Sequence, residues 1–318
     1  MDDIVQGAAI LAEQASQQAS EAAPIRKIGI IGAGQMGSGI AHVVALSGYD
    51  VALHDIAKDK VEAAIAVIDK NLTRQVASGK ITEEDKKKAL SRISYAGSLQ
   101  EFADADLVIE AATEDETVKR KIFVALCPFL KPAAIVGTNT SSISITRLAA
   151  ATDRPERFIG LHFMNPAPVM ELVEMIRGIA TEDATFGRTK EFVETLGKTV
   201  AVSEDFPAFM VNRILLPMIN EAVYTLYEGV GSVDAIDTAM RLGAHHPMGP
   251  LQLADFIGLD VCLSILNVLR DGFGNPKYAP CPLLVNMVTA GKLGSKSGEG
   301  FYVYNAGIKD LKVSARFK

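Results

Sequence analysis

Cysteine is scarce in this chain of 318 residues, which has 3 of them. Cys127, Cys262 and Cys281 form no Cys-x-x-Cys pair and stand at no metal-ligand spacing from a histidine. An odd, scattered set of this kind predicts neither a disulfide framework nor a zinc site, and we expect no bound metal. Free thiols are typical of reducing compartments, so we expect a cytoplasmic protein.

Excess positive charge is also absent. The chain has 32 Lys and Arg against 38 Asp and Glu, which gives a formal net charge of -6. A protein that binds nucleic acid through its phosphates needs a basic surface. We therefore expect no nucleic-acid partner.

No apolar run is long enough to cross a bilayer. The nearest candidate, residues 211–223, is broken by four polar residues: Asn212, Arg213, Asn220 and Glu221. We expect no membrane span. The first 24 residues contain acidic side chains but no Lys or Arg, which argues against a secretion signal or a mitochondrial presequence and favours a mobile extension.

Short apolar runs alternate with longer helical patterns from Ile25 to about Val202. This alternation predicts strand-helix-strand units around a mainly parallel, doubly wound sheet of the Rossmann type. The expected strands are 27–31, 50–54, 107–111, 135–138, 158–163, 172–176 and 199–202. The expected helices are 36–47, 57–78, 82–91, 116–127 and 183–196, with Thr82 as an N-cap.

After Ser203 the pattern becomes helical, which predicts a second, smaller all-α domain. Its expected helices are 212–228, 232–242, 250–269 and 283–290. The polar segment Ser203 to Pro207 is the expected linker. The domains are therefore an extension at 1–24, a nucleotide-binding domain at 25–205 and a helical domain at 206–318.

A glycine-rich turn follows the first strand directly. Gly32, Gly34 and Gly37 form a Gly-x-Gly-x-x-Gly pattern that opens a helix, with Gln35 and Met36 between the last two. In a dinucleotide site these glycines permit the tight turn, the approach of the pyrophosphate and close packing of helix on strand. A turn that binds nothing is the alternative, because glycine turns are common.

Asp55 strengthens the nucleotide hypothesis. It ends the second strand, 23 residues after Gly32. A carboxylate there accepts hydrogen bonds from the adenosine ribose and repels a 2′-phosphate, which predicts NAD rather than NADP. An N-cap role for Asp55 is the alternative.

His162 is the best candidate for a general base among 5 histidines. It lies near the carboxyl end of an expected strand, where ligands bind in open α/β sheets. Twelve residues on, Glu174 lies between apolar neighbours on one face of the next strand. A carboxylate bound to the imidazole would strengthen the base, although a purely structural ion pair fits the pattern equally well.

Two further polar groups have two interpretations each. Thr138 to Ser142 follows an apolar strand, so its hydroxyls either face the same sheet edge or cap the next helix. Asn212, at the start of the second domain, is either an N-cap or a side chain that reaches the ligand.

Several motifs resemble those of the 3-hydroxyacyl-CoA dehydrogenase family, in particular its bacterial 3-hydroxybutyryl-CoA members. The resemblance covers about Ile25 to Tyr304. It rests on Gly-Ala-Gly-Gln-Met-Gly at 32–37, Thr-Asn-Thr-Ser-Ser at 138–142, Gly-Leu-His-Phe-Met-Asn-Pro-Ala-Pro-Val-Met at 160–170, Val-Asn-Arg-Ile-Leu at 211–215 and His-Pro-Met-Gly-Pro-Leu at 246–251.

The resemblance implies NAD-dependent, reversible oxidation of an L-3-hydroxyacyl-CoA, with acetoacetyl-CoA and 3-hydroxybutyryl-CoA as the expected short-chain pair. It implies that His162 is the base, that Glu174 is its partner, and that Ser141 and Asn212 bind the reacting oxygen. Cofactor contacts are implied for Glu114, Lys119, Asn165 and Lys296, and CoA contacts for Asn71 and Arg74. Ser78 stands where many members carry lysine, which weakens the CoA assignment.

The resemblance also implies that the second domain closes over substrate and forms a homodimer. Two other hypotheses compete with it. A β-hydroxyacid or 6-phosphogluconate-type dehydrogenase would use a catalytic lysine, whereas a His-Glu pair fills that place here. A non-catalytic NAD-binding protein would need none of Ser141, His162, Glu174 and Asn212.

Overall fold

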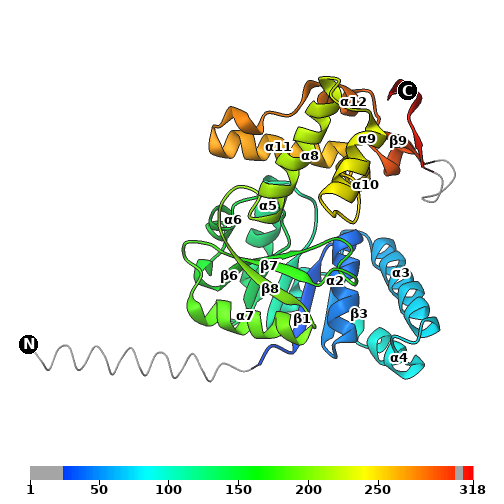
Figure 1. The fold of residues 1–318 in the computed structure, drawn as a ribbon. Coiled ribbons are helices and arrows are strands. Elements are labelled where there is room, and N and C mark those ends of the chain that lie inside the picture. Colours follow the sequence, from blue (N-terminus) through cyan, green and yellow to red (C-terminus); the bar gives the residue numbers. More distant parts are fainter. Residues whose placement is uncertain (1–23, 305–310, 318) are drawn as a thin grey trace, which may run out of the picture. The chain divides into compact units, whose positions relative to one another are not determined.

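The computed structural model describes residues 24–304 and 311–317, so the predicted extension, apart from Pro24, lies outside the described residues. The chain divides into two compact units, Met1–Asp205 and Phe206–Lys318 (Figure 1). The predicted linker is partly strand, because Ser203 and Glu204 pair with the neighbouring strand and belong to β8.

The first unit is built on an eight-stranded sheet in the order β3-β2-β1-β4-β5-β6-β7-β8. The first six strands in this order, from β3 at the edge to β6, are parallel to one another. Strand β7 is antiparallel to β6, and β8 is parallel to β7. The predicted Rossmann-type, mainly parallel sheet is confirmed. The strands are β1 (Lys27–Ile31), β2 (Asp50–His54), β3 (Ile93–Tyr95), β4 (Leu107–Glu110), β5 (Ile135–Thr138), β6 (Phe158–Phe163), β7 (Leu172–Arg177) and β8 (Thr199–Glu204).

Helices cover both faces of this sheet, which explains why the central strands read as continuous apolar runs. The helices α2, α3 and α7 share one apolar core with the strands. On the other face Phe123 of α5 packs edge-on against Phe158 of β6, with ring centroids 5.0 Å apart. The helices are α2 (Gln35–Leu46), α3 (Lys58–Ala77), α4 (Glu83–Ser91), α5 (Glu116–Leu126), α6 (Ile145–Ala149) and α7 (Asp183–Thr195).

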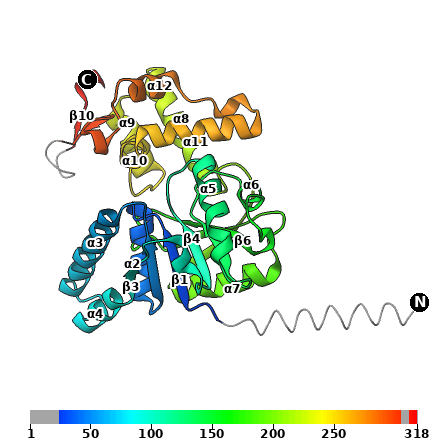
Figure 2. The same cartoon turned by 180° about the vertical axis from the view of Figure 1, so that it is seen from behind.

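The sequence analysis missed two short elements of this unit, β3 and α6. Both span too few residues for a clear periodicity. The N-cap at Thr82 is confirmed, because its side chain accepts from the Asp85 N–H in a capping box. Figure 2 shows α2, α3 and α4 toward the β3 edge, as the strand order requires.

The second unit is helical, as predicted, with one small addition. Its helices α8 (Val211–Tyr227), α9 (Val233–Thr238), α10 (Pro250–Ile257), α11 (Leu259–Phe273) and α12 (Pro282–Thr289) enclose a second apolar core. A two-stranded antiparallel ribbon, β9 (Tyr302–Val303) with β10 (Lys312–Val313), was not predicted. Each strand is only two residues long, too short to show an alternating pattern.

The single helix predicted at 250–269 is wrong. The chain breaks at Gly258, whose φ of 101° lies outside helical backbone, and α10 and α11 diverge by 96°. The apolar periodicity continues across the break, so the pattern alone predicts one continuous helix. Among the described residues no single helix is long and apolar enough to span a bilayer, and only this bent pair passes such a test when taken together.

Two buried carboxylates organise the second unit. Asp237 accepts from the N–H groups of Leu251 and Gln252, at 2.8 and 3.0 Å, and so fixes the start of α10. Asp255 accepts from the N–H groups of Phe301 and Tyr302, at 3.0 and 2.9 Å, and so holds β9 against α10. Burial raises the pKa of Asp255 to about 6.

The raised pKa predicts that the stability of this unit depends on pH. The folded state binds the Asp255 proton more tightly than the unfolded chain, whose reference pKa is 3.8. Protonated Asp255 therefore contributes its full stabilisation below pH 3.8, and this contribution is lost as the pH rises through about 6. Relative to Asp255→Asn, the free energy of unfolding should fall by about 3 kcal/mol across this window, as measured by urea denaturation. A difference that stays constant with pH would contradict this account.

Candidate active site

The glycine turn has the geometry of a phosphate-binding loop. Gly32 has a φ of 103°, and a Cβ at Gly37 would lie 1.7 Å from the Gly32 carbonyl oxygen. Gly34 differs, because a Cβ there would meet no atom within 4 Å. The α2 N-terminus has no side-chain cap, so its N–H groups are available to an anion. These features fit the pyrophosphate of a dinucleotide.

Asp55 lies beside this turn, where a ribose carboxylate is expected. Its Oδ2 accepts from the Ala33 N–H at 2.8 Å, which ties the end of β2 to the turn. Its Oδ1 lies 3.6 Å from the ammonium of Lys60, on the first turn of α3. The sequence analysis did not single out Lys60, because the pairing depends on where α3 begins.

A cavity of about 610 Å³ extends from the turn along α2 and α3. Asn71 and Asn165 line it together with Gln35, whose amide donates to the Asn165 side chain at 3.1 Å. Arg74, predicted to contact CoA, is exposed on α3 and does not line the cavity. The structure thus brings Asn71, but not Arg74, to the cavity that Asp55 also lines.

The loop that carries Asn165 is anchored by Lys198, which the sequence analysis missed. The ammonium of Lys198 donates to the carbonyl oxygens of Ala167 and Met170, at 2.8 Å each. Burial lowers the pKa of Lys198. Nothing in the sequence links Lys198 to this loop, which lies about 30 residues earlier.

His162 and Glu174 form the predicted pair. They are opposite each other in the antiparallel ladder of β6 and β7, and the His162 Nδ1 lies 2.7 Å from the Glu174 Oε2. Both side chains are buried. The Asn139 side chain accepts from the Phe163 N–H at 2.9 Å and joins the 138–142 loop to the end of β6. Of the other histidines, His54 bonds the Ala96 carbonyl oxygen, and burial lowers the pKa of His42.

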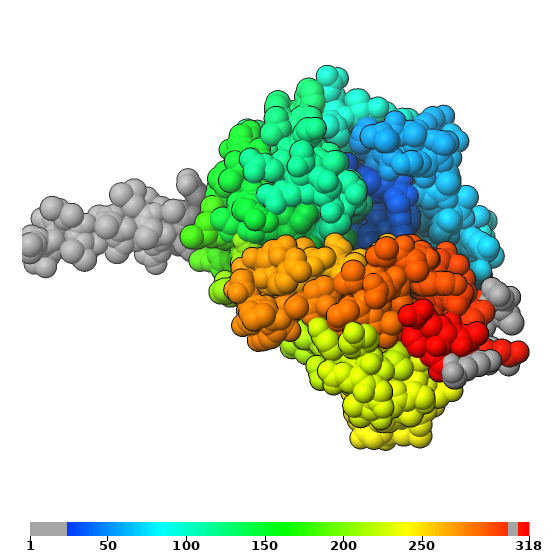
Figure 3. Space-filling view, turned by 90° about the horizontal axis from the view of Figure 1, so that it is seen from above, coloured from blue at the N-terminus to red at the C-terminus, as the bar shows by residue number. Residues whose placement is uncertain are grey.

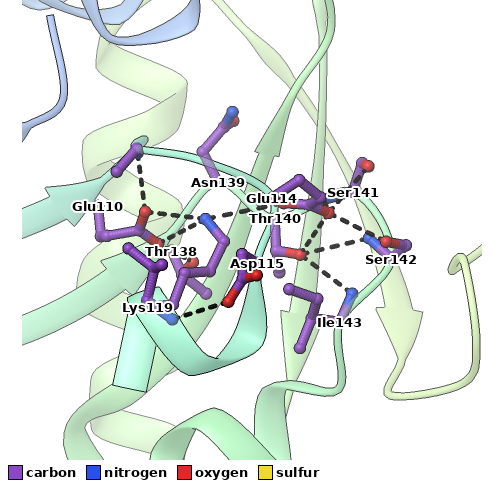
Figure 4. A network of polar contacts seen from close by, with 12 residues as sticks. Glu110, Glu114, Asp115, Lys119, Thr138, Asn139, Thr140, Ser141, Ser142 and Ile143 are labelled. Carbon is purple, nitrogen blue, oxygen red and sulfur yellow. Dashed lines mark hydrogen bonds and ion pairs between the residues drawn. The ribbon is translucent and has the colours of Figure 1, made fainter. Parts of the chain in front are cut away.

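Glu114 binds the 138–142 loop through several hydrogen bonds, as Figure 4 shows. Its Oε1 accepts from the Ser141 N–H at 2.8 Å and from the hydroxyls of Thr140, Ser141 and Ser142 at 2.7 to 3.1 Å. The Thr140 hydroxyl also accepts from the Ile143 N–H at 3.0 Å. Glu114 and Ser141, predicted separately as cofactor and substrate contacts, are therefore direct partners.

Two predicted site residues lie in the second unit. Asn212 stands in the first turn of α8. Lys296 is paired with Asp260 through contacts of 2.5 and 2.6 Å. This pairing was not predicted, because the two residues are 36 positions apart.

Two family models match this chain. The NAD-binding domain of 3-hydroxyacyl-CoA dehydrogenase matches residues 27–206, and the C-terminal domain of the same family matches residues 209–304. The chain belongs to the 3-hydroxyacyl-CoA dehydrogenase family. The resemblance inferred from the motifs is confirmed, and so are NAD as the cofactor and an enzymatic role.

Individual relatives agree with this placement. A 3-hydroxybutyryl-CoA dehydrogenase of Bradyrhizobium diazoefficiens is 69% identical over 283 residues, which are 89% of this chain and 97% of that protein. A probable 3-hydroxybutyryl-CoA dehydrogenase of Bacillus subtilis is 51% identical, over 88% of this chain and 98% of that protein. The crystal structure of an (S)-3-hydroxybutyryl-CoA dehydrogenase from Ralstonia eutropha superposes with a TM-score of 0.86 at 48% identity, over 88% and 99% of the two chains.

Gly34→Ala tests the phosphate loop of this dehydrogenase. The added methyl meets no protein atom, so the thermal unfolding midpoint should not change. It would stand where the pyrophosphate approaches, so the Kd for NADH should rise about tenfold or more in a fluorescence titration. The matched control is Gly187→Ala on α7, which is equally unhindered and should leave the Kd unchanged. Unchanged NADH binding by the Gly34 variant would contradict this role of the turn.

Proposed function

We propose that this dehydrogenase interconverts (S)-3-hydroxybutyryl-CoA and acetoacetyl-CoA. The observation that carries the proposal is the buried His162–Glu174 pair, with 2.7 Å between Nδ1 and Oε2. The activities of the relatives from Bradyrhizobium and Ralstonia, both named as 3-hydroxybutyryl-CoA dehydrogenases, support the four-carbon substrate.

Glu174 fixes the orientation of the imidazole. With Nδ1 bonded to the carboxylate, we assign the exchange of a proton with substrate to Nε2. The carboxylate also stabilises the imidazolium that forms when His162 takes a proton. The pair thus acts as a base in oxidation and as an acid in reduction.

His162 removes the proton of the substrate C3 hydroxyl. The C3–H bond breaks as the C3–O bond becomes a carbonyl, and bound NAD supplies the hydride acceptor. Ser141 and Asn212 bind the C3 oxygen and steady it as it changes. The bonds from Glu114 to the Ser141 N–H and hydroxyl, at 2.8 and 3.1 Å, support a fixed position for that side chain.

The remaining predicted contacts divide between cofactor and CoA. Gly32 to Gly37 and Asp55 hold the pyrophosphate and the adenosine ribose. The family resemblance adds Glu114, Lys119, Asn165 and Lys296 as cofactor contacts. Asn71 and Arg74 are the proposed CoA contacts; Asn71 lines the cavity beside Asp55, whereas Arg74 does not.

His162→Gln tests the proposed base. With acetoacetyl-CoA and NADH, kcat should fall about 10²- to 10⁴-fold, because a positioned general acid–base contributes about that much. The wild type should use NADH in preference to NADPH, because Asp55 opposes a 2′-phosphate. Absorbance at the NADH band measures both. NADH affinity should persist in the variant, and near-normal turnover would refute the role of His162.

We also propose that the second unit forms the contact of a homodimer. An apolar groove of about 470 Å³ lies in this unit, lined in part by Met218, Ala222, Ile236 and Met240. Val230 also lines this groove and is 75% exposed, so it adds to a contiguous apolar surface. In Figure 3 the yellow-green to yellow surface of the α8–α9 segment lies beside the orange surface of α11 and α12.

Val230→Glu tests this contact. A charge in the groove should convert a dimer into a monomer, as measured by sedimentation at micromolar concentration, because an unpaired charge is costly in a buried interface. The matched control is Ile179→Glu, at a residue 90% exposed in the first unit, which should leave the dimer intact. A wild type that sediments as a monomer would refute the proposal.

A further inference from the structure

Glu110 is a fully buried carboxylate that the sequence analysis did not single out. It ends β4 and is 0% exposed. Its two oxygens each lie 2.8 Å from the ammonium of Lys119 on α5, which is itself 1% exposed. Figure 4 shows this pair beside the loop gathered by Glu114. A buried ion pair of this kind calls for a role, because burial of charges is costly.

Glu110 is held from two further sides. The Thr138 hydroxyl donates to Oε2 at 2.7 Å, and the Ala112 N–H donates to Oε1 at 2.8 Å. These donors come from the end of β5 and from the segment after β4. The carboxylate therefore cannot rotate without losing a hydrogen bond, and its position dictates where the Lys119 ammonium lies.

Lys119 faces a second carboxylate, that of Glu114. The distance from its ammonium to the Glu114 Oε2 is 3.7 Å, while the other Glu114 oxygen binds the Ser141 loop. Glu114 is 38% exposed, in contrast to Glu110. The cation thus stands between an immobile buried carboxylate and one that reaches the surface of the site.

We propose that Glu110 is a positioning residue, which fixes the Lys119 ammonium so that Lys119 and Glu114 meet the cofactor in one geometry. This inference rests on the proposed function, in which Lys119 and Glu114 contact NAD. Glu110 itself touches neither cofactor nor substrate, and it acts through Lys119.

NADH binding by four proteins tests the proposal: the wild type, Glu110→Gln, Lys119→Met and the double variant. Glu110→Gln should raise the Kd about tenfold, within the range of couplings between contacting residues. Lys119→Met should raise it at least as much. The double variant should bind like Lys119→Met, because Glu110 has no effect once Lys119 is gone.

A matched control lies at the opposite end of the same strand. Asp106 immediately precedes β4, and its carboxylate pairs with Lys131 at 2.5 Å. Asp106→Asn removes a carboxylate–lysine pair that is less buried, with Asp106 14% and Lys131 39% exposed, so it should lower the thermal unfolding midpoint slightly and leave the NADH Kd unchanged. In steady state, Glu110→Gln should raise the KM for NADH more than it lowers kcat, whereas a loss of folded protein would lower kcat alone.

Three results would overturn the proposal: wild-type NADH affinity in Glu110→Gln, wild-type affinity in Lys119→Met, or a double variant that binds more weakly than Lys119→Met. If Glu110→Gln does not fold, Glu110→Asp takes its place, because it keeps the charge and moves the carboxylate away from Lys119. A raised NADH Kd in Glu110→Asp supports the proposal, and a wild-type Kd overturns it. A wrong substrate assignment would show separately, as a wild type that binds NADH and does not reduce acetoacetyl-CoA.

Discussion

The parallel arrangement of β1, β2, β4, β5 and β6 is the constraint on which the site depends. Parallel strands all end at one edge of the sheet, so whatever follows each strand is brought to the same place. The glycine turn, Asp55, Glu110, the 138–142 loop and His162 are each at or directly after the end of one of these strands. Residues from Gly32 to His162, which are 130 positions apart in sequence, are thereby collected at one edge of the sheet.

That constraint explains how much of the site the sequence could predict. The turn, Asp55 and His162 can each be recognised from the local sequence, because each is a glycine or polar residue at the end of an apolar run. Glu174 could be predicted from strand alternation alone, and the antiparallel register then places it directly opposite His162. Its role as something more than a structural ion pair required the family resemblance.

The residues that sequence analysis missed have a different origin. Glu110 pairs from the end of β4 with Lys119 on α5, a residue that the family resemblance had indicated without this partner. Lys60 contacts Asp55 from the start of α3, and Lys198 anchors a distant loop. Each contact depends on the position of a helix or loop relative to the sheet, which periodicity does not encode. The break at Gly258 was missed for the converse reason, since the apolar pattern remains regular while the backbone turns.

The reversal of chain direction between β6 and β7 has a consequence for motion. Because His162 and Glu174 are neighbours in one hydrogen-bonded ladder, a movement of the sheet as a rigid body carries both together and leaves their separation unchanged. Asn212 belongs to the other compact unit, where it lies in the first turn of α8. The spacing of the pair is thus set by the register of β6 and β7, and it does not depend on the position of any helix or loop.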